Sequence, residues 1–201
     1  AGRGMKDFSH VDGFSHVDTW VFDLDNTLYP ASCRLFDQID VKMGSFVSKL
    51  LNVDLAEAKR RQKEMFYKYG TTLRGLMTEH GITPDDFLDY VHDIDHSPVP
   101  PNKSLDDALH ALPGRKLIFT NGTVAHAEKV LNRIGITHHF GDIFDIVHSD
   151  FIPKPEMEPY RKFVRQTGIN PETSAMFEDI ARNLEAPHAL GMVTVLVVSP
   201  E

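Results

Sequence analysis

The chain has 201 residues, of which 41% are hydrophobic, and a formal net charge of −8. This length and composition suffice for one packed core with a small inserted segment. The negative charge disfavours a polynucleotide or an anionic membrane as partner, because both are bound through clustered basic side chains. No apolar run approaches the length of a membrane span and no secretion signal is visible, so we expect a soluble cytoplasmic protein, monomeric or homodimeric. The single cysteine, Cys33, excludes an internal disulfide framework.

The N-terminal region carries a short duplication. The segment Phe8–Asp12 recurs as Phe14–Asp18 and is too short to be a structural repeat. We interpret residues 1–17 as an N-terminal extension and assign no function to them.

An apolar run that begins at Trp20 ends in two carboxylates, Asp23 and Asp25. The run predicts a buried strand, and in an open α/β sheet the loop that leaves such a strand carries polar groups into the ligand crevice. Side chains two positions apart on an extended segment share a face, so one bound group can contact both carboxylates. A hard cation such as Mg²⁺ would neutralise their mutual repulsion.

A helical pattern spans residues 31–100. Apolar residues recur at helical spacing after Leu35 and again after Asp54. Thr83 and Pro84 predict the start of another helix, as N-cap and first helical residue. We therefore predict a helical cap domain over residues 31–100, inserted into an α/β core of residues 18–30 and 101–201. Helix and strand patterns alternate in the second part of this core, which predicts a Rossmann-like, doubly wound parallel sheet.

Three later segments place polar groups at strand ends of the predicted sheet, where we expect a ligand to bind. Lys116–Gly122 is a strand-to-helix turn whose hydroxyl and backbone N–H groups suit an anion. Lys154 lies between two prolines, which restrict its backbone. A third apolar run ends in the acidic pair Glu178 and Asp179.

These segments, in this order, resemble the motifs of the haloacid dehalogenase-like superfamily. The flanking stretches Asp23–Pro30, Tyr69–Leu76 and Met176–Leu184 are similar to the pyrimidine 5′-nucleotidase branch. The resemblance covers most of the chain from Asp18 onward, although family members usually continue beyond the last apolar run, Val193–Val198. It implies a Mg²⁺-dependent phosphatase that forms an aspartyl-phosphate.

We assign the roles on this basis. Asp23 is the nucleophile, and Asp25 is the general acid that later acts as the base. The Mg²⁺ ligands are Asp23, the Asp25 backbone carbonyl and Asp179, with Glu178 as a further ligand or an orienting group. The phosphoryl oxygens are bound by a set from two loops: Thr120, Asn121, Gly122 and Lys154. Thr27 and Asn183 are supporting residues.

We expect the cap to select the substrate, because the four motifs contact only the phosphate. The candidates offer aromatic stacking or hydrogen-bond donors: Tyr67, Tyr69, Thr71, Thr72 and Arg74. The branch resemblance implies a nucleoside monophosphate, UMP or CMP. Alternatives are a phosphatase of sugar phosphates or phosphoglycolate, a phosphomutase such as β-phosphoglucomutase, and a catalytically silent phosphate-binding scaffold. Asp25 disfavours a dehalogenase, which usually lacks an acid at this position.

The chain contains eleven histidines, and seven of them show no recurrent metal-ligand spacing. We interpret these seven as surface or capping residues: His10, His16, His80, His92, His96, His138 and His139.

Overall fold

The computed structural model of the chain describes residues 13–199, so the first copy of the duplication lies outside the described residues. Five parallel strands form one sheet in the order β3-β2-β1-β4-β5. They are β1 (Thr19–Phe22), β2 (Arg115–Phe119), β3 (Asp142–Phe144), β4 (Ser174–Glu178) and β5 (Val193–Leu196). The order reverses between β1 and β4, which is the topological switch point where such sheets bind ligands. The predicted doubly wound α/β fold is confirmed.

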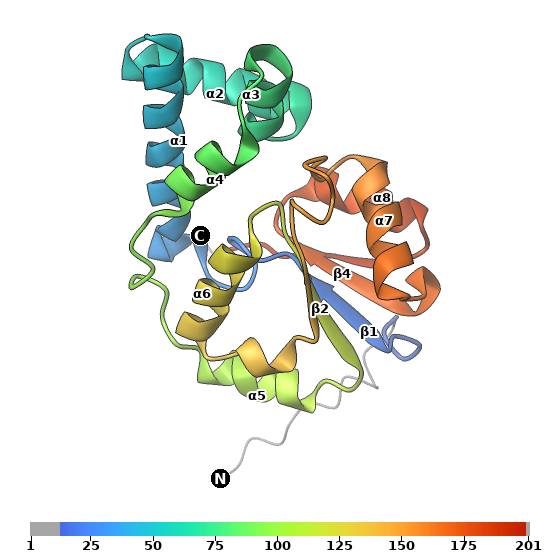
Figure 1. Cartoon of the computed structure of the whole chain (residues 1–201). Helices are drawn as coiled ribbons and strands as arrows, with labels where there is room; N and C mark the ends of the chain where they lie inside the picture. Colours follow the sequence, from blue (N-terminus) through green and yellow to red (C-terminus); the bar gives the residue numbers. More distant parts are fainter. Residues whose placement is uncertain (1–12, 200–201) are drawn as a thin grey trace.

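Helices cover both faces of this sheet (Figure 1). On one face α5 (Lys103–Ala111) and α6 (Val124–Ile134) pack against Trp20 and Phe22. On the other face α7 (Met157–Thr167) and α8 (Glu185–Ala189) belong to the apolar cluster that contains Val21. Alternate residues of β1 thus point to opposite faces, and all four residues are buried, which explains why the strand is continuously apolar from Trp20 onward.

The remaining long helices lie together in the segment predicted as the cap, at one end of the sheet (Figure 1). They are α1 (Leu35–Leu51), α2 (Leu55–Tyr69), α3 (Thr72–His80) and α4 (Pro84–His92). Their apolar faces form a separate cluster around Ile39, Met65 and Phe87, which Ile146 of the sheet region also joins. The Asp54 and Thr71 side chains cap the backbone N–H groups of α2 and α3.

Short 3₁₀ turns complete the path of the chain. They are η2 (Ala31–Cys33), η3 (Thr137–His139), η4 (Pro171–Thr173) and η5 (Ala181–Leu184). Cys33 is a free, half-buried thiol. Among residues 13–199, no helix combines the length and the apolar character needed to cross a bilayer.

Gly114 controls how closely β1 and β2 approach each other. Its φ is +104°, and a Cβ added there would lie 2.0 Å from the backbone oxygen of Asp18. The same oxygen accepts a hydrogen bond from the N–H of Arg115, at 3.0 Å, where the two strands begin to pair. The absence of a side chain at Gly114 therefore permits the contact that fixes the β1–β2 register.

Replacing this glycine should weaken the sheet. We expect Gly114→Ala to lower the free energy of unfolding by about 2–4 kcal/mol, because positive φ and the clash with backbone each cost energy. Gly141→Ala is the matched control, since a Cβ there would meet nothing within 4 Å. Its effect should stay within about 0.5 kcal/mol. Urea unfolding curves of the two variants measure the difference, and equal curves would contradict this account of Gly114.

Candidate active site

The predicted motif residues meet at the carboxyl ends of neighbouring strands. Asp23 follows β1, Thr120 follows β2, and Glu178 is the last residue of β4. The N–H of Asp23 donates to the carbonyl of Phe177, at 2.9 Å, so the pairing of β1 with β4 continues up to the site. Residues far apart in the sequence are therefore brought together by the parallel sheet itself.

Lys154 is the centre of this arrangement. Its side chain is 1% exposed, and its ammonium donates to Asp23 Oδ1, Glu178 Oε2 and the carbonyl of Phe119, each at 2.9 Å. Burial disfavours the charged ammonium, but the two carboxylates outweigh burial and raise the pKa of Lys154 above its ordinary value. All three ammonium hydrogens are thus engaged by protein acceptors, so Lys154 contacts a phosphoryl oxygen only by exchanging one of them.

The acidic groups around Lys154 outnumber it. Burial and the neighbouring Asp23 charge raise the pKa of Glu178, although Lys154 opposes the rise. Burial also raises the pKa of Asp179 to about 6. The hydroxyl of Thr27 lies 3.0 Å from Asp23 Oδ2 and 3.1 Å from Asp179 Oδ1, but its one hydrogen can serve only one carboxylate at a time. The cluster therefore retains uncompensated negative charge.

The donor set of this cluster fits Mg²⁺, the cation implied by the resemblance of the motifs. Carboxylate oxygens of Asp23, Glu178 and Asp179 all lie within 4.8 Å of one another. Mg²⁺ prefers such oxygen ligands and usually binds through one or two carboxylates. Glu178 is the least available of the three, because its oxygens already accept from Lys154 and from the backbone N–H of Asp179. Asp23 and Asp179 are therefore the better candidates.

Asp25 has its own set of partners. Its Oδ1 accepts from the hydroxyl of Tyr29 at 2.7 Å and lies 2.8 Å from His126 Nε2. Burial alone would raise the pKa of Asp25, but the contacts with His126 and Tyr29 outweigh burial and lower it. Burial and the Asp25 charge raise the pKa of Tyr29, so Tyr29 stays a hydrogen-bond donor.

Sequence reasoning missed His126 altogether. This side chain is fully buried in the first turn of α6, with Nδ1 at 3.1 Å from His96 Nε2 and its ring stacked on His92 at 4.5 Å. His92 and His96 are therefore not the surface or capping residues that the sequence predicted. Burial, followed by the His126 charge, lowers the pKa of His92 to about 3. The available signal was position, since the first turn of a helix that follows a motif strand faces the site.

The phosphate-binding candidates hold one another in place. The hydroxyl of Thr120 accepts from the N–H of Gly122 at 3.0 Å, which leaves its hydrogen for another acceptor. The side-chain amide of Asn121 makes two hydrogen bonds with the backbone of Lys154: its Oδ1 accepts from the N–H at 2.9 Å, and its Nδ2 donates to the carbonyl at 3.2 Å. The carbonyl of Asn183 accepts from the buried hydroxyl of Tyr160 at 2.6 Å. Asn121 thus fixes the Lys154 loop, and Asn183 is anchored to α7.

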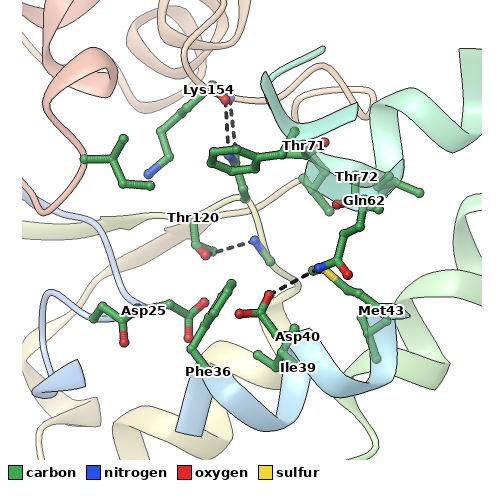
Figure 2. Close-up of a pocket in the computed structure, with 18 of the residues that line it drawn as sticks. Asp25, Phe36, Ile39, Asp40, Met43, Gln62, Thr71, Thr72, Thr120 and Lys154 are labelled. Carbon is green, nitrogen blue, oxygen red and sulfur yellow. Dashed lines mark hydrogen bonds between the residues drawn. The ribbon is translucent and has the colours of Figure 1, made fainter. Parts of the chain in front are cut away.

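A cavity of about 420 Å³ opens above these residues and extends between the cap helices. Figure 2 shows Lys154, Thr120 and Asp25 on one side and residues of α1 and α2 on the other. The cap side combines apolar walls with a few polar groups: Phe36, Ile39, Met43, Phe66, Phe87, Asp40 and Gln62. Such a mixture is typical of small-molecule sites.

The predicted specificity residues divide into two groups. Tyr67, Thr71 and Thr72 line this cavity. Tyr69 does not, and its hydroxyl instead donates to Glu79 at 2.9 Å. Arg74 is likewise absent from the cavity wall.

A second group of ligand-type side chains lies outside this site. Asp106 Oδ1 is 2.6 Å from His139 Nε2 and 3.2 Å from His138 Nε2. Lys103 also contacts the Asp106 carboxylate, at 3.5 Å. His139 is therefore a buried partner of Asp106 rather than a surface residue, and the nearby ammonium disfavours a cation at this group.

The comparison with known proteins identifies a class of hydrolases. A family profile described as haloacid dehalogenase-like hydrolase matches residues 17–191, which is most of the chain. The chain belongs to the haloacid dehalogenase-like hydrolase family, as the four motifs predicted. The narrower resemblance to the pyrimidine 5′-nucleotidase branch stays a prediction.

Two curated relatives carry names connected with phosphate. Phosphate metabolism protein 8 of Saccharomyces cerevisiae is 28% identical over 193 residues, covering 87% of this chain and 60% of the yeast protein. The chain thus spans less than two thirds of that relative's length. Glyceraldehyde 3-phosphate phosphatase of Methanopyrus kandleri is 26% identical over 192 residues, covering 88% of this chain and 82% of the archaeal protein.

Solved structures share the fold at low identity. A haloacid dehalogenase-like family protein from Streptococcus pneumoniae has a TM-score of 0.60 at 15% identity, covering 92% of this chain and 86% of that one. The hydrolase YfnB from Bacillus subtilis, whose structure contains magnesium, has a TM-score of 0.58 at 17% identity, covering 92% and 90%.

Removing the Lys154 charge should destabilise the protein strongly. We expect Lys154→Met to lower the free energy of unfolding by about 3–5 kcal/mol, because Asp23 and Glu178 would remain buried without a counter-charge. Lys103→Met removes an ammonium that is 80% exposed, and we expect no resolvable change from it. Urea unfolding at neutral pH compares the two variants. A Lys154→Met protein as stable as the wild type would show that this ion cluster does not hold the fold.

Proposed function

We propose that this protein is a Mg²⁺-dependent phosphatase that hydrolyses small phosphate monoesters through an aspartyl-phosphate. The observation that carries the proposal is the Asp23 carboxylate, which lines the cavity while Lys154 holds Oδ1 and Thr27 contacts Oδ2. A carboxylate fixed in this way is oriented for attack on a phosphorus atom above it. The names of the two curated relatives are consistent with phosphate chemistry.

In the first step Asp23 attacks phosphorus. A bond forms between its carboxylate oxygen and phosphorus, and the bond from phosphorus to the substrate alkoxide breaks. Asp25 gives its proton to the departing oxygen, and the negative phosphoryl group beside Asp25 favours the protonated form that this requires. Thr120 donates its hydroxyl hydrogen to a phosphoryl oxygen. When bound by Asp23, Asp179 and the Asp25 carbonyl, Mg²⁺ supplies neutralisation of the phosphoryl charge.

In the second step water hydrolyses the acyl phosphate. Asp25, now a carboxylate, accepts a proton from the water molecule that attacks the phosphorus. Inorganic phosphate leaves and Asp23 returns to its ionised form. The same residue thus serves as acid and then as base, so the loss of Asp25 impairs both halves of the cycle.

We propose that residues 31–100 act as the cap that selects the alcohol, with UMP and CMP as the preferred substrates. The cavity offers aromatic and aliphatic walls for a planar base, and Tyr67, Thr71 and Thr72 add polar groups. The branch resemblance supports the same class. A second candidate is a triose or other small sugar phosphate, which the name of the archaeal relative favours. Phosphoglycolate phosphatase and phosphomutase activities remain alternatives.

Phosphate release from a panel of esters tests the proposal. The panel with Mg²⁺ comprises UMP, CMP, AMP, glyceraldehyde 3-phosphate, phosphoglycolate and β-glucose 1-phosphate. We expect the highest kcat/KM for UMP and CMP, loss of activity with EDTA, and a fall of at least about 10³-fold in Asp23→Asn, because the amide is a poor nucleophile. A hydroxylamine-sensitive ³²P label on the quenched wild type, absent from Asp23→Asn, would identify the aspartyl-phosphate.

The outcomes separate the alternatives. A preference for glyceraldehyde 3-phosphate keeps the mechanism and rejects the nucleotidase assignment. Isomerisation of β-glucose 1-phosphate without phosphate release indicates a phosphomutase. If no ester is hydrolysed, with or without EDTA, the result favours a catalytically silent phosphate-binding scaffold and contradicts the proposal.

A further inference from the structure

Asp25 presents its two carboxylate oxygens to different surroundings. Oδ1 receives Tyr29 and His126, at 2.7 and 2.8 Å. Among residues 13–199 no hydrogen bond joins Oδ2 to the protein, and Asp25 lines the cavity. Two donors on one oxygen fix the rotation of the carboxylate and leave the other oxygen as the atom that exchanges a proton with the substrate.

His126 is itself held from three sides. Its backbone N–H donates to the Thr123 hydroxyl at 3.2 Å, which caps α6 and sets the position of the first turn. The ring of His92 is stacked on it at an interplanar angle of 11°, and His96 lies at hydrogen-bond distance from Nδ1. The His126 side chain is 0% exposed, so its ring has no alternative position in solvent.

The contacts of His126 restrict its ring at both nitrogens. Oδ1 of the Asp25 carboxylate is an acceptor, so His126 carries a hydrogen on Nε2. Its other ring nitrogen, Nδ1, lies 3.1 Å from His96 Nε2. The ring is thus held between Asp25 on one side and His96 on the other.

We propose that His126 is a positioning residue for the general acid, aiming Oδ2 of Asp25 at the leaving oxygen, and that His96 holds the His126 ring in place through its contact with Nδ1. This inference rests on the proposed phosphatase function and adds a residue from outside the four motifs. His126 itself touches neither the substrate nor the reacting atoms. Its effect reaches the reaction only through the orientation of Asp25, which makes the effect depend on how much the leaving group needs a proton.

Two substrates separate positioning of the acid from a general structural role. The alkoxide that leaves UMP, or whichever alkyl ester of the panel is the best substrate, needs protonation, whereas 4-nitrophenolate leaves without it. We expect His126→Leu to lower kcat/KM for the alkyl ester about 10- to 100-fold, with KM little changed. The fall for 4-nitrophenyl phosphate should be less than about fivefold, because attack by Asp23 is unaffected.

Matched variants complete the experiment. His126→Gln keeps an N–H donor at a similar reach and should recover most of the alkyl-ester activity. His96→Leu changes a half-buried side chain. It should lower kcat/KM for the alkyl ester by about 3- to 10-fold and leave kcat/KM for 4-nitrophenyl phosphate unchanged. In an Asp25→Asn background, His126→Leu should cause little further loss on the alkyl ester, because both residues act through one proton transfer.

Equal losses on both esters without rescue by His126→Gln would assign His126 a structural role and overturn the inference. A His126→Leu variant with unchanged kcat/KM for both esters would overturn the inference as well. If His126→Leu fails to fold, His126→Gln and His96→Leu still test the inference. The quantity compared is then the ratio of kcat/KM for the alkyl ester to kcat/KM for 4-nitrophenyl phosphate. A wild type inactive on every ester refutes the proposed function first, before any variant is compared, and the inference falls with it.

Discussion

The buried ammonium of Lys154 is the interaction on which the site depends. It bonds Asp23 after β1, the carbonyl of Phe119 in β2 and Glu178 in β4, so it joins three neighbouring strands from a loop that follows β3. Without it the two carboxylates would be buried with no counter-charge and the Phe119 carbonyl would lose a hydrogen bond, and both losses cost free energy. Asp23, which we propose as the nucleophile, is therefore oriented by the same contact that holds the ends of the sheet together.

This contact leaves the charge of the site unbalanced. One ammonium lies among Asp23, Glu178 and Asp179, and the raised pKa of Asp179 reflects the cost of a second negative charge in a buried position. A divalent cation would offset that cost and would allow a phosphate group to approach acidic side chains. Apolar side chains of the cap helices line the cavity above the site, and a ligand that displaces water from this cavity would strengthen these interactions. In the proposed phosphatase, the excess of acid and the apolar walls of the cavity would together make the binding of a cation and of a phosphate ester mutually favourable.

The sequence predicted the core better than the cap. Apolar runs that end in polar residues locate strand ends, and a parallel sheet necessarily gathers those ends, so Asp23, Thr120 and Glu178 could be brought together without coordinates. His126 could not be found in this way, because its role depends on which face of α6 meets Asp25, a contact across 101 residues. Tyr67 and Tyr69 differ for a similar reason. Both lie on α2, but they point in different directions around the helix axis. Tyr67 therefore lines the cavity, whereas Tyr69 bonds Glu79.

The cap is attached to the core through contacts that reach the chemistry. Arg182, close to the acidic pair, lies over the ring of Phe66 and bonds its carbonyl at the end of α2. On the other side, His92 at the end of α4 and His96 in the chain that follows both contact His126. A shift of the cap that changes the cavity must therefore alter one or both contacts. Because His126 in turn contacts Asp25, the segment that lines the cavity is mechanically connected to the carboxylate that we propose as the general acid.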